Sequence, residues 1–385
     1  MILNDPCQDS SWLDYGVTIP FPVARPRKIL DFLGGRSNDF PGPVIELNDA
    51  VRLLGKDASW IIDKNDIERV HKKEYAGVLF GDQGDQAQAN ALLDIYELID
   101  KHGNPKRYNK NLAKKSLKDL FDRVIINRLY GTYIAVQLAL QDKSGFCYYL
   151  AGGNHHARYD WGAGFCVFND MIFAARKLQA DGQAKLIWLI DVDAHKGCGS
   201  AEIVEFIRTG KTGHPFEKDC DILTLSAHMA RGWPLDDEVL SEAKPERAPF
   251  ISSDIDIPIE SGEESLYCAK LEAGLRRLEL LSAKRGRRLK DALCDFAIVV
   301  DGSDPYEADG LESSSLLQLT LEQCLERDRL IFRFLREREI KSAWVLAGGY
   351  GERAWEPHAQ FLLSLSRQLA EIRLNESASL FTPKL

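Results

Sequence analysis

The middle of this 385-residue chain contains the run Leu186-Ile-Trp-Leu-Ile-Asp191-Val-Asp193-Ala-His195-Lys-Gly197-Cys198-Gly199. Its apolar first part has the length of a buried strand. Asp191, Asp193 and His195 follow at alternate positions, so an extended backbone places their side chains on one side. Two glycines, Gly197 and Gly199, then allow the backbone to turn, and a helical pattern follows from Ser200 to Ile207. The stretch therefore predicts a strand, a loop with the polar residues, and a helix, in that order. Because sites in open α/β sheets lie at this end of a strand, the spacing predicts metal ligands. An ordinary loop with helix-capping aspartates and an incidental histidine is the alternative.

The composition predicts a soluble globular protein. Hydrophobic residues make up 45% of the chain, which is enough for a large core, and the net charge of −9 argues against direct nucleic-acid binding. The eight cysteines are scattered, without a Cys-x-x-Cys pair, and are typical of reduced core residues. The N-terminus lacks the pattern of a signal peptide, and no apolar run has membrane-spanning length. We therefore expect a cytoplasmic protein that does not bind membranes, although a nuclear protein or an exported effector fits the same features.

Short strands alternate with helices from Phe146 onward. The expected strands are Phe146 to Leu150, Leu186 to Ile190, Ile222 to Leu225, Phe296 to Val300 and Ala343 to Leu346. The expected helices are Val167 to Gln179, Ala201 to Arg208, Glu263 to Leu281, Leu316 to Arg338 and Pro357 to Ile372. This alternation predicts an α/β fold with a mainly parallel sheet covered by helices on both faces.

The chain before residue 146 has a different texture. Helical periodicity is clear from Gln86 to Ile99 and from Leu112 to Leu140, and prolines punctuate the first fifty residues. We expect residues 1–145 to form mostly helices and loops, and residues 146–360 to form the core that carries the motifs. No repeat or linker divides the chain, so residues 1–385 are expected to form a single domain.

Polar residues follow each of the five expected strands. In chain order they are Ala151-Gly-Gly-Asn-His155-His156-Ala, then Asp191, Asp193 and His195, then Ser226-Ala-His228, then Asp301-Gly-Ser-Asp304-Pro, and finally Ala347-Gly-Gly-Tyr350-Gly. Separate loops and turns would explain each motif singly. Their joint placement after successive strands instead predicts a catalytic metal site on one rim of the sheet.

These residues have the chemistry of an amide hydrolase. Asp193, His195 and Asp304 would offer two carboxylates and one imidazole, a set that suits Zn²⁺ and also admits Fe²⁺ or Co²⁺. His155 and His156 would take and return the proton that the leaving amine needs. Tyr350 would donate its hydroxyl to the oxyanion of the reacting carbonyl.

The motifs resemble those of the zinc-dependent histone deacetylases. They are Gly-Gly-Asn-His-His-Ala, Gly164-Phe-Cys-Val-Phe-Asn-Asp170, Asp-Val-Asp-Ala-His, Gly-Ser-Asp-Pro and Gly-Gly-Tyr, in the family's order from about Arg128 to His358. The N-terminal third resembles the family only weakly. The Ala-His-Lys-Gly context is similar to class IV and bacterial deacetylase-like amidohydrolases.

The resemblance implies an arginase/deacetylase-like fold and removal of acetyl or longer acyl groups from lysine side chains of proteins such as histones. It implies zinc on Asp193, His195 and Asp304, His156 as the main proton carrier, His155 as its electrostatic partner oriented by Asp191, and Tyr350 as the group that polarises the carbonyl. A structural K⁺ site would comprise Asp191, Asp193, His195, Ser226 and Ala227. Gly164 with Phe165, and more loosely Trp233, resemble the walls of the acyl-lysine tunnel; plain core packing would also explain the two aromatic rings.

Cys198 departs from the family pattern, which has Asp or Asn at this position. A thiol is a weak hydrogen-bond partner for the second histidine, which puts the rate of lysine deacetylation in doubt. Cys198 would then tune the histidine, unless it merely fills space and another acceptor holds that ring.

Other functions fit parts of the sequence. The substrate could be an acetylpolyamine or another small amide, and a protein that binds acyl-lysine with little turnover would also keep the pocket. An arginase-type enzyme with two manganese ions would share the fold, but Asp301-Gly-Ser-Asp304-Pro does not space its carboxylates as that site requires. The oligomeric state and the preferred acyl length are not encoded in these motifs.

Overall fold

The computed structural model describes residues 1–19, 24–35, 43–55, 64–100, 102–212, 221–236, 251–285 and 293–366. Its centre is an eight-stranded sheet with the order β2-β1-β3-β8-β7-β4-β5-β6, in which every pairing is parallel. The strands are β1 (Ile2–Asn4), β2 (Val44–Glu46), β3 (Phe146–Tyr149), β4 (Leu186–Asp191), β5 (Asp221–Met229), β6 (Ile255–Ile259), β7 (Phe296–Asp301) and β8 (Ser342–Leu346). The predicted α/β sheet is confirmed.

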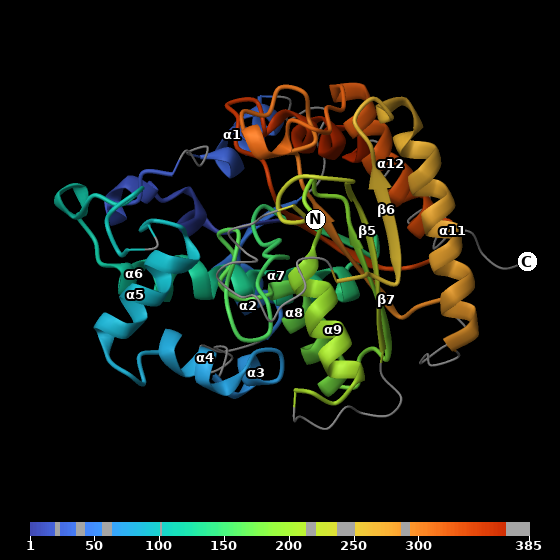
Figure 1. Ribbon diagram of the computed structural model, residues 1–385. Coiled ribbons are helices and arrows are strands. Elements are labelled where there is room, and N and C mark those ends of the chain that lie inside the picture. The colour runs from blue at the N-terminus through green and yellow to red at the C-terminus, as the bar shows by residue number, and fades with distance from the viewer. Residues whose placement is uncertain are drawn as a thin grey trace, which may run out of the picture.

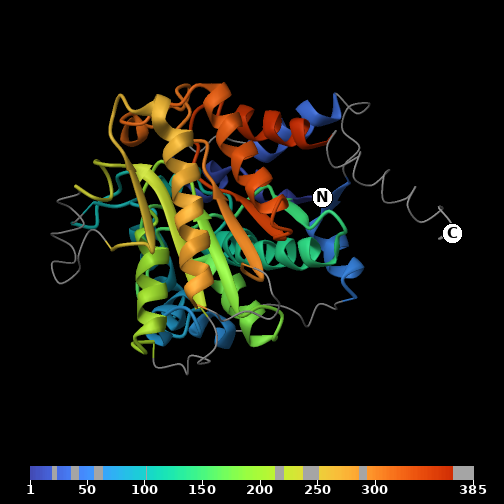
Figure 2. The same cartoon turned by 90° about the vertical axis from the view of Figure 1, so that its right-hand side faces the viewer.

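Helices cover both faces of the sheet (Figures 1 and 2). One face packs against α1 (Arg25–Gly34), α11 (Tyr267–Arg285), α12 (Leu321–Arg336) and the helical residues 356–366. The other face packs against α2 (Leu47–Leu53), α3 (Lys64–Glu68), α4 (Lys73–Leu79), α5 (Asp85–Ile95), α6 (Leu117–Leu120), α7 (Ile126–Gln141), α8 (Asp170–Ala180) and α9 (Cys198–Arg208). Short 3₁₀ turns lie at Pro6–Asp9, Trp12–Tyr15, Lys110–Leu112, Glu264–Leu266 and Glu312–Ser314.

The central strands are buried on both faces, so β4 and β7 are apolar up to the aspartates, Asp191 and Asp301, that end them. In β4, Trp188 belongs to the core under α11 and α12, whereas its neighbour Leu189 belongs to the core under α7 and α8. Successive side chains of a strand alternate in this way. The two cores fix the register of β4 against β5 and β7, and so they also fix where its polar carboxyl end lies.

Three strands were missed by the sequence interpretation. Before residue 146, where mostly helices and loops were expected, the structure also contains the short strands β1 and β2. Each is three residues long, which is too short for a strand pattern to stand out in the sequence. Strand β1 is buried throughout, whereas β2 lies at the edge of the sheet with Val44 exposed. The third, β6, is the opposite edge; its alternation of isoleucine with Asp256 and Pro258 is typical of an edge strand.

Helix boundaries also differ from the sequence interpretation. The expected helix from Leu112 to Leu140 is divided into α6, a π-helical turn at Phe121–Ile125, and α7. The expected helix from Leu316 begins at Leu321, where Thr320 and Gln323 form a capping box. Residues 367–372, the end of the last expected helix, lie outside the described residues.

The sheet order brings the polar strand ends together. β8, β7 and β4 are neighbours, β3 lies beside β8, and β5 lies beside β4, so five carboxyl ends meet along one edge. None of the described helices combines the length and apolar composition needed to cross a bilayer.

Candidate functional site

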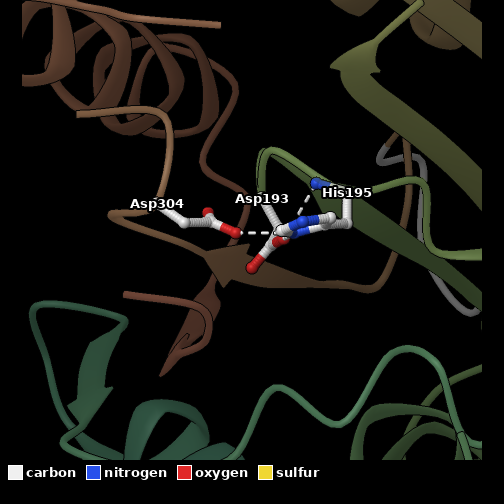
Figure 3. A group of neighbouring side chains, drawn as sticks. All are labelled: Asp193, His195 and Asp304. Carbon is white, nitrogen blue, oxygen red and sulfur yellow. Dashed lines mark hydrogen bonds and ion pairs between the residues drawn. The ribbon is translucent and has the colours of Figure 1, made fainter. Parts of the chain in front are cut away.

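Asp193, His195 and Asp304 form a buried cluster at the carboxyl ends of β4 and β7 (Figure 3). His195 Nδ1 lies 3.2 Å from Asp193 Oδ1 and 2.8 Å from Asp304 Oδ2, and one donor atom from each residue lies within 4.8 Å of the others. Among the residues that the structure describes, this is the one such group of His, Cys, Asp and Glu side chains.

The donor set and its surroundings fit a divalent cation. Burial and the neighbouring Asp193 carboxylate raise the pKa of Asp304 to about 7, which indicates that the two negative charges repel each other in the absence of a cation. Two glycines also leave room around these oxygens. A Cβ on Gly302 would lie 2.5 Å from Asp193 Oδ2, and one on Gly348 would lie 2.5 Å from Asp193 Oδ2 and 2.6 Å from Asp304 Oδ2. A metal with N and O ligands suits this set.

His155 is held by a carboxylate. Its Nδ1 lies 2.7 Å from Asp191 Oδ2, and its Nε2 lies 3.6 Å from Asp193 Oδ1. Burial alone would lower the pKa of His155, but Asp191 and Asp193 outweigh it and raise this pKa to about 9. A Cβ on Gly197 would overlap the Asp191 carboxylate, so the glycine lets the start of α9 approach the pair.

His156 has a different environment. Its ring centroid lies 3.9 Å from that of His155, 6.0 Å from that of His195 and 4.4 Å from that of Trp233. Within the described parts of the chain, the His156 ring makes no hydrogen bond. Burial, followed by the charges of His155 and His195, lowers the pKa of His156 well below 6.5. Cys198 is the first residue of α9, and burial raises the pKa of its thiol.

A buried aspartate holds the loop that carries the histidine pair. Asp170 accepts hydrogen bonds from the backbone N–H of Gly153 at 3.0 Å and of Asn154 at 2.8 Å, and from Thr132 Oγ1 at 2.5 Å. The preceding residue, Asn169, caps α8 and donates to Ser200 Oγ at 2.9 Å. The sequence interpretation used these residues only as part of a motif. Their structural role could have been predicted from the sequence, because an Asn-Asp pair precedes an apolar helical run.

A buried arginine joins the two loops that supply the metal ligands. Arg327 of α12 donates Nη1 to the carbonyl oxygens of Val192, 3.1 Å away, and Gly302, 2.8 Å away. Its Nη2 lies 2.7 Å from Asp301 Oδ1, and its Nε lies 2.7 Å from Asp328 Oδ1. Val192 precedes Asp193, and Gly302 lies two positions before Asp304. The sequence interpretation missed Arg327, for which a charged pair on the apolar face of α12 was the only signal.

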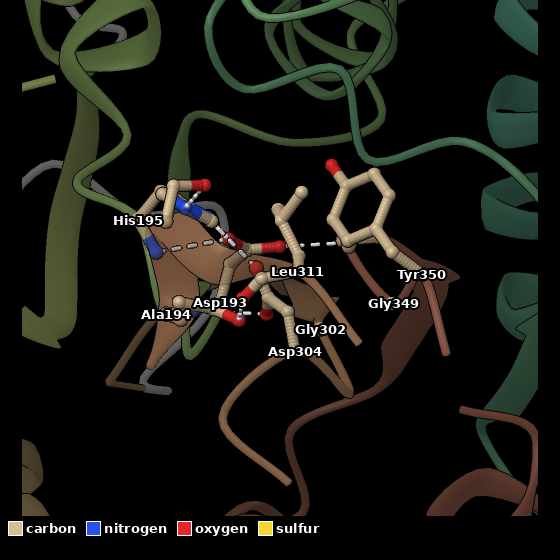
Figure 4. Close-up of polar contacts among 12 residues, drawn as sticks. Asp193, Ala194, His195, Gly302, Asp304, Leu311, Gly349 and Tyr350 are labelled. Carbon is tan, nitrogen blue, oxygen red and sulfur yellow. Dashed lines mark hydrogen bonds and ion pairs between the residues drawn. The ribbon is translucent and has the colours of Figure 1, made fainter. Parts of the chain in front are cut away.

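Tyr350 lies on the loop after β8, beside Gly349 (Figure 4). Asp309 Oδ2 accepts from the backbone N–H of Tyr350 at 2.6 Å, and Arg25 donates to the carbonyl oxygens of Ala347 at 2.6 Å and Gly348 at 2.8 Å. Neither Asp309 nor Arg25 was identified from the sequence, since both come from outside the quoted motifs. Burial, together with Asp193 and Asp304, raises the pKa of Tyr350 well above 10, so its hydroxyl remains a hydrogen-bond donor.

An outer cavity of about 430 Å³ leads to this cluster. His195, Phe165, Trp233, Leu311 and Tyr350 line it, and the charged residues Glu97, Arg107 and Glu312 lie at its rim. The Phe165 and Tyr350 ring centroids are 6.4 Å apart. Gly164 has a φ of +52°, and a side chain there would overlap Trp233 and approach His156 Cδ2 to 2.6 Å, so the position requires glycine.

The residues predicted to bind K⁺ are brought together by strand pairing. Ser226 of β5 is opposite Asp191 of β4, and Ala227 follows it, while Asp193 and His195 continue from β4. Ser226 Oγ lies 3.1 Å from His228 Nδ1. The structure thus places all the predicted site residues at the same edge of the sheet, and K⁺ binding remains a prediction.

Comparisons with known proteins agree with this geometry. The family profile described as histone deacetylase domain matches residues 46–364. An uncharacterised protein of the cyanobacterium Picosynechococcus is 27% identical over 223 residues, and histone deacetylase 2 of Arabidopsis thaliana is 25% identical over 240 residues. These alignments cover 58% and 62% of this chain but only 61% and 52% of the two relatives.

The fold is also similar to a solved structure. The crystal structure of the HDA15 HD domain matches 95% of this chain and 91% of its own length, with a TM-score of 0.58 and 17% identity. This likeness, together with the parallel sheet and its helices on both faces, establishes the expected arginase/deacetylase-like α/β fold.

Proposed function

This chain belongs to the histone deacetylase family, and on that premise we propose that it is a metal-dependent hydrolase of acylated lysine side chains. The observation that carries the proposal is the arrangement of two histidines, His155 and His156, beside the Asp193, His195 and Asp304 cluster at the inner end of a cavity. A pair of imidazoles next to a metal site combines proton transfer with activation of a carbonyl group.

Asp193, His195 and Asp304 would hold the metal. Two carboxylates balance the charge of a divalent ion, and the mixed oxygen and nitrogen donors favour Zn²⁺, with Fe²⁺ or Co²⁺ as alternatives. When bound, the ion would supply a Lewis acid that polarises the substrate carbonyl and acidifies water. The pKa of Asp304, raised by burial and by Asp193, supports the need for a cation here.

The histidine pair would move the proton. In hydrolysis, water adds its oxygen to the carbonyl carbon, the carbon–nitrogen bond breaks, and the amine leaves with an added proton. A ring nitrogen of His156 would accept the proton from water and deliver it to the amine, because its lowered pKa keeps the ring neutral at the outset. His155, fixed by Asp191 and cationic through its raised pKa, would act as the electrostatic partner.

Tyr350 would stabilise the negative charge that develops on the substrate oxygen. Its hydroxyl stays protonated because burial raises its pKa, and the bond from its backbone N–H to Asp309 holds the loop in place. A preorganised donor of this kind favours the transition state over the bound substrate.

The outer cavity would accept the lysine side chain. Phe165 and Trp233 would contact its methylene groups, while the rim residues Glu97, Arg107 and Glu312 would face the rest of the substrate. An acyl-lysine in a protein such as a histone is the proposed substrate, and an acetylpolyamine is the small-molecule alternative. A structural K⁺ ion on Asp191, Asp193, His195, Ser226 and Ala227 would brace the loop behind the metal.

A second candidate is a protein that binds acyl-lysine with little turnover. It is favoured by the contrast between His155, which has a carboxylate partner, and His156, whose ring lacks a hydrogen bond within the described residues. Cys198 stands where a carboxylate partner was expected.

A panel of substrates tests both candidates. Peptides with acetyl-lysine or longer acyl-lysines, together with acetylpolyamines, would be incubated with the metal-loaded protein, with and without a chelator. We expect release of free amine that stops with the chelator and returns when Zn²⁺ is restored. Tight binding of an acyl-lysine peptide without amine release would support the second candidate, and neither binding nor release would overturn both.

A further inference from the structure

Two cavities meet at the proposed site. The inner cavity, of about 120 Å³, is lined at one end by His155, His156 and Asp193, and it shares Gly164, Phe165 and Tyr350 with the outer cavity. This inference rests on the proposed function. If the lysine side chain enters through the outer cavity, its acyl group extends past the metal ligands into the inner one.

The inner cavity is larger than an acetyl group needs. A cavity of about 150 Å³ holds benzene, so about 120 Å³ accommodates on the order of four or five non-hydrogen atoms. The methyl carbon of an acetyl group would leave most of this space unfilled. The volume therefore suits an acyl chain that continues for several atoms beyond the carbonyl.

The lining of the inner cavity contains two positively charged side chains. Arg25 and Arg128 both line it, with Gln8 and Trp12. The two terminal nitrogens of Arg25 donate to the carbonyl oxygens of residues 347–349, so Arg25 is committed to the Tyr350 loop. Asp193 is the single acidic residue in the described lining, and it is one of the proposed metal ligands.

Arg128 is held without using its terminal nitrogens. Its Nε donates to Gln8 Oε1 at 3.1 Å, and its guanidinium lies 6.0 Å from the centre of the Trp12 ring. In the described parts of the chain, neither terminal nitrogen of Arg128 has a hydrogen bond or an ion pair. A guanidinium fixed in this manner can bind a carboxylate through two parallel hydrogen bonds.

We propose that the preferred acyl group ends in a carboxylate, as malonyl and succinyl groups do, and that Arg128 recognises that carboxylate. Beyond the carbonyl carbon, a succinyl group has two methylenes and a carboxylate, which matches the space available. A neutral chain of equal length would place apolar or uncharged atoms against the guanidinium and desolvate it without compensation. Hydrolysis would release the free amine and a dicarboxylate.

The test compares four forms of one peptide, whose lysine carries an acetyl, butyryl, succinyl or succinamoyl group. The last has nearly the shape of succinyl but no charge. With metal-loaded full-length protein, kcat/KM for succinyl should exceed those for acetyl and succinamoyl by at least about tenfold, the scale set by one charged hydrogen-bonded pair. Arg128→Gln should reduce the ratio of succinyl to acetyl by about the same factor, whereas Arg128→Lys should retain part of it.

Binding measured by fluorescence polarisation separates this inference from the proposed function. Succinyl peptide that binds in an Arg128-dependent manner but is not cleaved would contradict the hydrolase and support the recognition of an acidic acyl group. Cleavage or binding that favours acetyl or butyryl over succinyl, or an equal loss for all four peptides in Arg128→Gln, would overturn the inference and leave the hydrolase intact. Since each ratio is taken within one protein preparation, a partly unfolded variant does not change it.

Discussion

Buried carboxylates lie at both ends of the sheet, but their partners differ. At the amino end, Asp221 starts β5 and Asp254 precedes β6. Arg208 contacts both, with Nε 3.0 Å from Asp221 Oδ1 and Nη2 2.9 Å from Asp254 Oδ2, and Arg285 Nη1 lies 3.2 Å from Asp221 Oδ2. Two negative charges therefore meet two guanidinium groups.

At the carboxyl end, Asp193 and Asp304 contact His195. Within the described chain, no arginine or lysine forms an ion pair with either carboxylate. Burial and then Asp193 raise the pKa of Asp304 to about 7, whereas burial of His195 is outweighed by hydrogen bonds to the two carboxylates, which raise the pKa of His195 to about 10. A protonated His195 therefore offsets only one of the two negative charges. The carboxylates at the amino end therefore have their charges balanced by arginines of the chain and play a structural role. Those at the carboxyl end need a cation from outside the chain.

The largest expected effect concerns the chemistry assigned to the carboxyl end. Tyr350→Phe should lower kcat on an acyl-lysine peptide by about a hundredfold or more and leave KM nearly unchanged, because the hydroxyl acts on charge that develops only in the transition state. Tyr133→Phe is the control, because it removes the hydroxyl of a tyrosine on α7 that donates to the Asp181 carboxylate. Steady-state kinetics decide the matter; an unchanged kcat for Tyr350→Phe would mean that the loop is only structural.

Two arginines, Arg327, which is buried, and Arg208, which is partly exposed, extend the comparison. Arg327 joins the loops that carry the metal ligands, and Arg208 joins strands at the opposite end. Because groups that orient metal ligands contribute to affinity, Arg327→Lys should weaken Zn²⁺ binding by about ten- to a hundredfold, measured by competition with a chromophoric chelator. Arg208→Lys should lower the melting temperature without changing zinc affinity. An equal loss of zinc affinity in both variants would show that Arg327 has no specific role in positioning the metal ligands.

The pH dependence of the metal-free protein provides a smaller effect. Burial and Asp193 raise the pKa of Asp304 from 3.8 to about 7, so the unfolded state ionises first as pH increases. The stability of the metal-free protein should therefore fall between about pH 4 and pH 7, by up to about 4 kcal/mol at roughly 1.4 kcal/mol per pKa unit. Asp304→Asn should remove this contribution, and thermal melting of both proteins across this range measures it. If the melting temperatures of the two proteins change with pH in the same way, the ionisation of Asp304 does not destabilise the metal-free protein.

The smallest effect is expected at Cys198. If an acidic partner for His156 raises its pKa and fixes its tautomer, Cys198→Asp should increase turnover a few-fold or move the pH optimum upward. Cys198→Ser, which stays neutral, is the control. Coincident pH–rate profiles with equal kcat for Cys198→Asp and the unaltered protein would mean that Cys198 only fills space at the start of α9.

Much of the fold was predictable because the information is local. The runs at β4 and β7 are apolar up to the aspartate that ends each strand, which fits strands buried on both faces, and the residues after them carry the ligands. Strand β2 left no such signal, since a three-residue edge strand buries too little to show a pattern. The division of the expected helix from Leu112 to Leu140 was equally hidden. The π-helical turn at Phe121–Ile125 continues the helical pattern of apolar residues, so nothing in the sequence marks it.

The sequence predicted the proposed metal ligands and catalytic residues but not the residues that hold them in place. The ligands and histidines stand in short motifs, but Arg327 and Arg25 reach the site from helices far away in sequence. The charged pair Arg327-Asp328 on the apolar face of α12 is the one local signal, and the sequence around Arg25 offers no comparable one. The free terminal nitrogens of Arg128 likewise become visible only when its helix is placed against the inner cavity.

The metal content of the purified protein tests the central claim most directly. The protein would be loaded with Zn²⁺, dialysed, and analysed by mass spectrometry of the elements alongside Asp193→Ala, Asp304→Ala and the amino-end control Asp254→Asn. We predict about one ion per chain in the unaltered protein and in Asp254→Asn, and nearly none, with no activity, in the two ligand variants. Full activity in metal-free protein, or equal metal content in all four proteins, would contradict the account.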